Sequence, residues 1–155
     1  MSDYIHDLRK KTGHMPLILN AVAGVVLNDD NQVLLQKRTD SNNWSLPGGY
    51  MEYGETFEQT LKREMLEDSG LKVEPIRCLT TLDQGFTTYP NGDKCQCIGR
   101  FYLVRVVGGS TADADKSEAI GLKYFDLNDL PEIFNQQTID ILKYVQKHVI
   151  ENNER

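Results

Sequence analysis

Three acidic side chains crowd one face near the end of a predicted helix. The segment from Thr56 to Ser69 contains neither proline nor glycine, and it carries an apolar stripe at helical spacing. Glu64, Glu67 and Asp68 stand at positions i, i+3 and i+4, so their charges repel one another. They also lie where the helix dipole disfavours negative charge, at a cost of about 0.3–1 kcal/mol each. A cation from outside would offset these costs, and carboxylate oxygens suit Mg²⁺ or Mn²⁺.

The residues before this helix decide between a solvated acidic face and a functional cluster. Three acids on an arbitrary helix are most often a solvated face. Here the turn Pro47-Gly48-Gly49 precedes the helix, and Gly54 stands beside Glu55 at its start. Two consecutive glycines remove side-chain bulk, so the backbone of this turn can approach a ligand closely. Acids and glycine turn together favour chemistry on phosphate oxygens, because a divalent cation neutralises their charge and activates water.

The segment from Gly49 to Leu71 resembles the Nudix box. That pattern reads glycine, five residues, glutamate, seven residues, arginine-glutamate, an aliphatic residue, any residue, two glutamates, any residue, glycine and an aliphatic residue. One position of this chain departs from it, because Asp68 replaces the second glutamate of the pair and reaches one methylene less far. The resemblance continues more loosely from about Ala21 to about Pro131. The positions that match in register are Gly49, Glu55, Arg63, Glu64, Met65, Glu67, Gly70 and Leu71.

The resemblance implies an enzyme that hydrolyses a pyrophosphate bond in a nucleoside diphosphate linked to another moiety. It assigns Glu64, Glu67 and Asp68 as ligands of Mg²⁺ or Mn²⁺. Arg63 would orient the acids by pairing with Glu55, because its fork of donors fits a carboxylate. Glu64 is one candidate for the general base, since acids packed together can have a raised pKa.

Further site residues are expected outside the box. The family often brings another carboxylate from a later loop, and Glu118, in the segment 113–118, is predicted for that role. Arg38, at the end of a predicted strand, is predicted to contact a phosphate. Gly48 and Gly49 are predicted to bring backbone to the substrate, and Tyr89 to contact it. Other loop aromatics could stack on a base or equally pack in the core: Trp44, Tyr50 and Phe86.

The substrate prediction rests on the region after the box. In this family a tyrosine about 18 residues past the box suggests dinucleoside polyphosphates, and a proline slightly earlier suggests ADP-ribose. Tyr89 lies 18 residues after Leu71, and Pro90 follows it. We expect an ADP-ribose or nucleotide-sugar type of substrate. A nucleoside triphosphate or dinucleoside polyphosphate pyrophosphohydrolase stays open, as does a non-catalytic nucleotide-binding module, although such a module has no reason to keep three repelling carboxylates.

Composition limits the partners. The 155 residues carry a formal net charge of −6, with 39% hydrophobic and 26% charged residues, which predicts one soluble domain over 1–155. The acidic balance excludes a general attraction to nucleic acid polymers or anionic membranes, which leaves a small nucleotide as the expected partner. No apolar run approaches the roughly 20 residues of a membrane span. Three cysteines without C-x-x-C spacing (Cys78, Cys95 and Cys97) indicate structural thiols in a reduced, cytoplasmic setting. A homodimer is left open.

The order of elements favours an α/β protein, and the resemblance implies a Nudix-type α/β/α sandwich with a central mixed sheet. A helical extension is expected over 1–16, with a solvent-facing Arg9-Lys10-Lys11 run. A polar loop is expected over 39–43 and another over 110–117. The predicted helices are 3–11, 56–69 and 135–150, the last with Ile139, Leu142, Val145 and Val149 on one side, and the predicted strands are 17–27, 33–37, 71–82, 95–107 and 122–125.

Overall fold

Two sheets meet in one central layer of the molecule. The computed structural model describes residues 3–117 and 119–153. One sheet has the strand order β4-β1-β6-β5 and the other β3-β2-β7. The elements are α1 (Asp3–Thr12), β1 (Leu17–Val25), β2 (Val33–Arg38), β3 (Trp44–Ser45), β4 (Gly48–Tyr50), α2 (Phe57–Ser69), β5 (Leu71–Thr88), β6 (Lys94–Gly109), the 3₁₀ turn η1 (Thr111–Asp113), β7 (Ala119–Phe125), α3 (Gln136–Val145) and the π-helical turn η2 (Gln146–Glu151).

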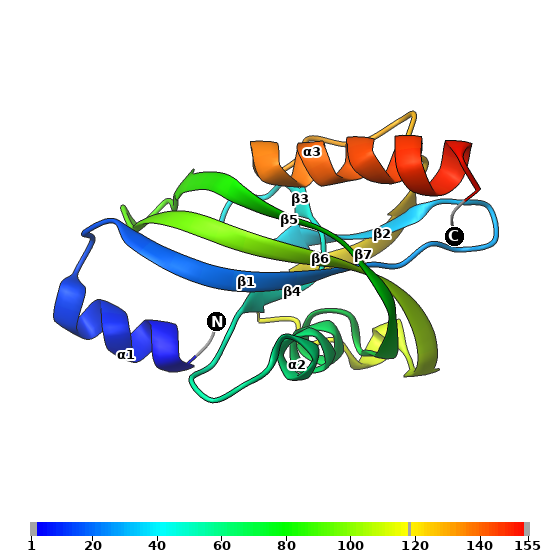
Figure 1. Cartoon of the computed structure of the whole chain (residues 1–155). Coiled ribbons are helices and arrows are strands. Elements are labelled where there is room, and N and C mark those ends of the chain that lie inside the picture. Colours follow the sequence, from blue (N-terminus) through cyan, green and yellow to red (C-terminus); the bar gives the residue numbers. More distant parts are fainter. Residues whose placement is uncertain (1–2, 118, 154–155) are drawn as a thin grey trace.

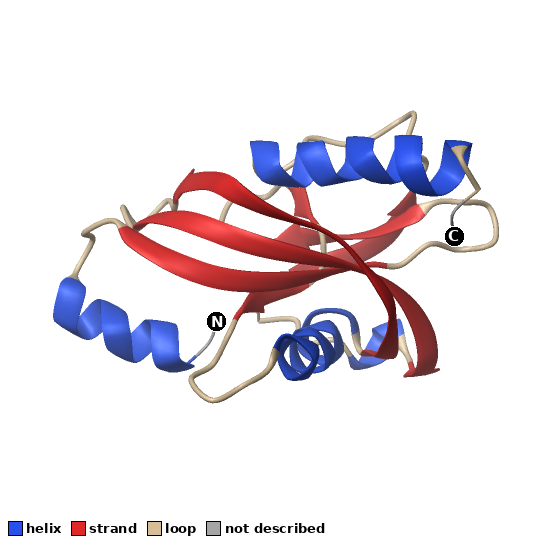
Figure 2. Cartoon of the chain, viewed as in Figure 1, coloured by secondary structure: helices blue, strands red, loops and turns tan. Residues whose placement is uncertain are grey.

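Helices cover both faces of this layer. Figure 1 shows α3 above the strands, α2 below them, and α1 at the end where β1 begins. Figure 2 shows the same three layers by type of structure. Strands β1 and β6 run parallel, whereas β1–β4 and β5–β6 are antiparallel. The predicted α/β/α sandwich with a mixed sheet is therefore confirmed. Among the described residues, no helix is both long and apolar enough to cross a membrane.

The acid-bearing helix α2 is fixed at both ends by its own sequence. Thr56 and Gln59 form a reciprocal capping box at its start. Leu61 and Met65 are fully buried against the sheet, as their spacing predicts. Gly70 ends the helix in the left-handed conformation with φ of 72°, and its N–H bonds the carbonyl of Leu66. These contacts set which side of α2 faces the sheet, and therefore where its acids point.

Several boundaries differ from the sequence expectation. The strands β5 and β6 run longer than predicted, because register shifts near Pro75 and between Leu82 and Gly85 let the hairpin continue past residues that normally end a strand. The short strands β3 and β4 were not predicted, since two or three residues give no period. In α3, Ile141 is buried together with the predicted Leu142 and Val145, whereas Ile139 is only partly buried.

The prediction that the side chain of Arg9 faces solvent is wrong. Its side chain is only 10% exposed, because it donates to the carbonyls of Gly13, Met15 and Lys94. Two of those carbonyls follow α1 directly and the third lies on β6, so Arg9 fastens the end of α1 to the sheet. Sequence alone could not separate it from the neighbouring lysines, since all three read as a solvated run.

Gly70 provides a test of how α2 is terminated. A Cβ at Gly70 would lie 2.1 Å from the carbonyl oxygen of Ser110, whereas one at Gly13, which has a similar φ of 60°, would meet nothing within 4 Å. Both alanine variants incur left-handed strain of about 1–2 kcal/mol. The added clash should lower the free energy of unfolding of Gly70→Ala by about 1–3 kcal/mol more than that of Gly13→Ala. Urea unfolding of the two variants measures this difference, and equal losses would show that α2 can shift to accept the methyl group.

Candidate active site

Two carboxylates of α2 are buried against the glycine turn. Glu64 is 3% exposed and Asp68 is 2% exposed. A Cβ at Gly49 would lie 2.5 Å from the carboxyl carbon of Glu64, so position 49 must be glycine for that carboxylate to sit here. This steric requirement explains the glycine that opens the box. It also brings backbone and carboxylate to one point, as the sequence predicted.

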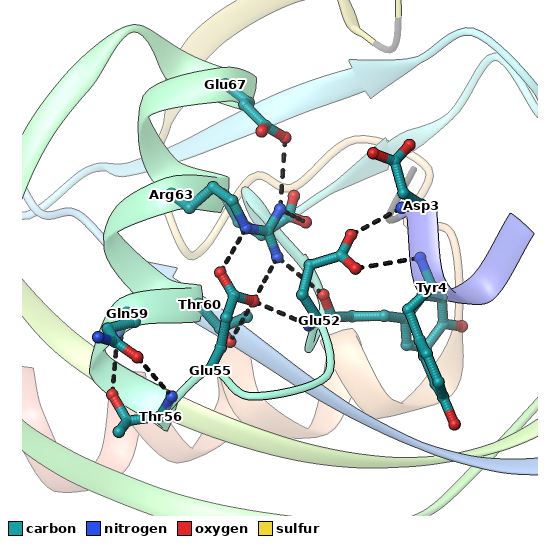
Figure 3. A network of polar contacts seen from close by, with 11 residues as sticks. Asp3, Tyr4, Glu52, Glu55, Thr56, Gln59, Thr60, Arg63 and Glu67 are labelled. Atoms are coloured by element: carbon teal, nitrogen blue, oxygen red, sulfur yellow. Dashed lines mark hydrogen bonds and ion pairs between the residues drawn. The ribbon is translucent and has the colours of Figure 1, made fainter. Parts of the chain in front are cut away.

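Arg63 connects the acids in a network that Figure 3 shows from close by. Its Nε and Nη2 donate to the two carboxylate oxygens of Glu55 at 2.7 and 2.8 Å, which confirms the predicted pair. Its Nη1 donates to Glu64 at 2.7 Å and lies 3.6 Å from an oxygen of Glu67. Its Nη2 also donates to the carbonyl of Tyr50. The guanidinium lowers the pKa of Glu55 to about 2 and holds the Glu64 carboxylate in one orientation.

Asp68 holds the glycine turn from the other side. Its Oδ2 accepts from the backbone N–H of Gly48 at 2.9 Å and from Nε2 of Gln36 at 3.1 Å. Burial raises the pKa of Asp68 to about 6. Burial and the neighbouring charge of Asp68 raise the pKa of Glu64 to about 7. The sequence did not single out Gln36, because a glutamine within a strand gives no signal of its own.

The donor set suits a divalent cation. Glu64 and Glu67 both approach Nη1 of Arg63, so their oxygens already converge on positive charge. Beside Asp68, the buried Oε1 of Gln36 has no hydrogen-bond partner within the described part of the chain. Carboxylate and amide oxygens are the ligand types that Mg²⁺ and Mn²⁺ prefer. Among residues 3–117 and 119–153 no three His, Cys, Asp or Glu side chains gather closely enough to hold a metal, and Glu118 lies outside the described residues.

A cavity of about 500 Å³ opens beside these acids. Glu64, Asp68 and the two turn glycines line it, as do Arg38 and Tyr89. It therefore brings together most of the residues that the sequence proposed for catalysis and substrate binding. Arg63 and Glu67 do not belong to its lining among the described residues, and Arg63 is connected to it through its hydrogen bond to Glu64.

Arg38 also lines the cavity. Its guanidinium donates to both oxygens of Asp40 at 2.9 and 2.8 Å, and its central carbon lies 4.0 Å from the ring centroid of Phe134. The ring of Tyr89 lies 5.9 Å from that of Phe134. The pair with Asp40 raises the pKa of Arg38 although burial acts against it. Arg38 thus lies where a phosphate in the cavity could reach it, held by an acid and an aromatic face.

The aromatic candidates separate into two groups. Tyr50 and Tyr89 line the cavity, and their hydroxyls hydrogen-bond each other. Trp44 packs edge-on against Phe125 in the core, and Phe86 is 72% exposed, so neither lines the cavity. The start of α3 supplies lining residues that the sequence did not predict, although the N-cap at Asn135 was a readable signal. These residues are Asn135, Gln137 and Thr138.

The raised pKa values predict how the metal-free protein responds to pH. A carboxyl with a folded pKa above its unfolded pKa adds stability that is complete below about pH 4 and is lost as the pH rises through about 6 to 7. The free energy of unfolding in chelator should therefore fall by about 1–3 kcal/mol between pH 5 and 8. Glu64→Gln should flatten this fall, because a neutral amide has no proton to lose.

The matched control is Glu58→Gln, since Glu58 is an exposed acid on the same helix. Denaturant unfolding at several pH values should give the wild-type slope for this variant. A Glu64→Gln slope equal to that of Glu58→Gln would show that Glu64 titrates alike in the folded and unfolded chain.

The chain is similar to known proteins in sequence and in fold. Residues 18–145 match the NUDIX domain. An ADP-ribose pyrophosphatase from Methanocaldococcus jannaschii is 33% identical over 116 residues, which cover 73% of this chain and 64% of that protein. The solved MutT NUDIX hydrolase from Burkholderia pseudomallei is 25% identical with a TM-score of 0.70, covering 83% of this chain and 98% of that one. A solved UDP-X diphosphatase shares the fold at 19% identity with a TM-score of 0.69, covering 97% of this chain and 71% of that one. The matches span between about a third and two thirds of the length of the curated relatives.

Proposed function

The chain belongs to the NUDIX domain family, and we propose that it hydrolyses the pyrophosphate bond of a nucleoside diphosphate linked to another moiety, of the ADP-ribose or nucleotide-sugar type. One observation carries the proposal. The buried carboxylates of Glu64 and Asp68 line the same cavity of about 500 Å³ as the guanidinium of Arg38. A pyrophosphate held at the acids through a metal ion can therefore also contact the guanidinium of Arg38.

The proposed ligands of the divalent cation are Glu64, Glu67 and Asp68, with Glu118 as a further carboxylate. When bound, the cation would neutralise charge on the bridging phosphate oxygens and favour hydroxide over water near neutral pH. Asp68 would serve through an oxygen other than Oδ2, because Oδ2 already accepts two hydrogen bonds. Its shorter side chain is matched by the close approach of the Gly48 backbone.

The remaining residues position the reacting groups. Arg63 fixes the carboxylate of Glu64, which lines the cavity and is the proposed general base towards the attacking water. Asp68 holds the Gly48 N–H, so the turn keeps its close approach to the site. Arg38 would hold the phosphate distal to the acids, with its fork oriented by Asp40 and Phe134.

The shape of the cavity favours a substrate with a bulky group on each side of the pyrophosphate. Its described lining includes four aromatic residues, Tyr50, Tyr89, Phe101 and Phe134. The M. jannaschii relative is named for a substrate of this type, ADP-ribose. A nucleoside triphosphate or dinucleoside polyphosphate remains the alternative, and a non-catalytic nucleotide-binding module is the alternative of another class.

A panel of substrates distinguishes these functions by the products that are formed. ADP-ribose and UDP-sugars should give a nucleoside monophosphate and a sugar phosphate, whereas a nucleoside triphosphate would give a monophosphate and pyrophosphate. Chromatography with Mg²⁺ or Mn²⁺ present identifies the products directly. Binding of nucleotides without turnover of any panel member would support the non-catalytic module.

Glu67 gives the cleanest catalytic test because its side chain is 44% exposed and its loss leaves no buried gap. Glu67→Gln should keep the thermal midpoint of the wild type. It should lower kcat by about 100-fold or more, because a charged carboxylate ligand of the cation is replaced by a neutral amide. Glu58→Gln on the same helix should leave kcat unchanged. Near-normal kcat in Glu67→Gln would remove Glu67 from the metal site.

Arg38 should act on substrate binding rather than on the chemical step. Arg38→Ala should raise KM about tenfold, equivalent to about 1.4 kcal/mol, with a smaller change in kcat. Asp40→Asn should raise KM by a smaller factor than Arg38→Ala, because Arg38 then loses the carboxylate that orients its fork. Lys37→Ala, at the neighbouring strand position outside the cavity lining, is the control. An unchanged KM in Arg38→Ala would place the phosphates elsewhere.

A further inference from the structure

Helix α1 lies before the matched NUDIX domain and yet contributes to the cavity. The matched residues are 18–145, whereas α1 covers Asp3–Thr12. Its Ile5 is only 4% exposed, lines the cavity, and packs in a cluster with Leu19 and Cys95. A helix that merely preceded the domain would present its apolar side to the outer surface of the sheet. Here two residues of the helix, Ile5 and Arg9, line the cavity.

The first turn of α1 is bound to the loop of the acidic site. The carboxylate of Glu52 accepts from the backbone N–H groups of Asp3 and Tyr4 at 2.6 and 3.0 Å, where the helix dipole favours negative charge. The backbone N–H of Glu52 donates to Glu55 at 2.8 Å, and Glu55 holds Arg63. Figure 3 shows this continuous path from α1 to α2. The N-terminal end of α1 is therefore placed relative to the acids.

The last turn of α1 is bound to the turn that carries Tyr89. Arg9 donates to the carbonyl of Lys94 at 2.6 Å, and its Nε lies 3.7 Å from Asp93. The N–H of Tyr89 donates to the carbonyl of Asp93 in the same turn. Both ends of α1 are thus attached to segments that contribute to the cavity, so the position of Ile5 between them is fixed.

We propose that α1 is a wall of the substrate cavity and that Ile5 is a specificity-determining residue, in contact with the uncharged, ring-bearing end of a nucleotide. The proposal rests on the proposed function only in taking a nucleotide as the ligand. The side chains around Ile5 in the cavity are apolar or aromatic, namely Leu19, Cys97, Tyr50 and Tyr89. The guanidinium of Arg9, which also lines the cavity, already donates to three carbonyls and lies 3.7 Å from Asp93. Such a surface suits a nucleobase and not a phosphate.

The test compares two truncations on the same helix. Leu8 packs against the same cluster as Ile5 but does not belong to the cavity lining. Ile5→Ala and Leu8→Ala therefore both loosen α1, whereas only Ile5→Ala changes the wall. The probes are AMP, dGMP, CMP and UMP, which contain no phosphoric anhydride and are not consumed. Titration calorimetry of the full chain with Mg²⁺ gives Kd for each, and thermal melts measure the loss of stability.

Ile5→Ala should change Kd at least fivefold for the tightest of the four probes and alter their ranking. Leu8→Ala should change each Kd less than twofold. Ile5→Trp, which fills the wall instead of opening it, should weaken the tightest probe by a similar or larger factor. Equal effects of Ile5→Ala and Leu8→Ala, unchanged Kd values in Ile5→Ala, or a wild type that binds none of the four would each overturn the proposal. If the Kd values follow these expectations but no substrate of the panel is hydrolysed, the proposed hydrolase function is rejected. The proposed role of Ile5 in the cavity wall then still holds.

Discussion

The acidic end of the cavity is assembled around one partly buried guanidinium. Arg63 takes both oxygens of Glu55, one oxygen of Glu64, and lies near a third carboxylate, Glu67. Without this cation, acids placed near the C-terminal end of a helix would repel one another and turn to solvent. With it, Glu64 stays buried and faces the turn at Gly49. The fork geometry matters as much as the charge, because a lysine could not bind Glu55 with two donors and Glu64 with a third.

Burial of Glu64 and Asp68 has an electrostatic cost that the structure only partly relieves. Arg63 lowers the pKa of Glu64, yet burial and the charge of Asp68 outweigh it and leave that pKa near 7. Asp68 receives two hydrogen bonds and still has a pKa raised to about 6. A fold under selection for stability alone would replace such a pair, since buried like charges are unfavourable. The pair lies beside an open cavity, next to an amide oxygen of Gln36 that has no hydrogen-bond partner in the described part of the chain, and this supports the proposed cation site.

Local sequence signals predicted the parts of the molecule that are set by local physics. The helix α2, its glycine stop and its buried apolar stripe follow from periodicity and backbone preference. The pairing of Arg63 with Glu55 followed from the family resemblance and the geometry of the two side chains. The failures are contacts between distant segments. In the sequence Arg9 is one of three consecutive basic residues, and only the structure shows its contact with Lys94. The contact of Arg38 with the ring of Phe134 likewise joins segments that are distant in the sequence. No pattern within one segment contains that information.

The same distinction explains why α1 was predicted as a helix but not as part of the site. Its amphipathic pattern requires only that Ile5 and Leu8 be covered, and many surfaces could cover them. What decides the outcome is Glu52, a residue in the box loop that no pattern marks, whose carboxylate satisfies the free N–H groups at the start of α1. The loop that orients Arg63 therefore also anchors a helix outside the matched domain. Because one short segment serves both purposes, a shift of α1 would be transmitted to Glu55, and the cavity wall and the acids form a single structural unit.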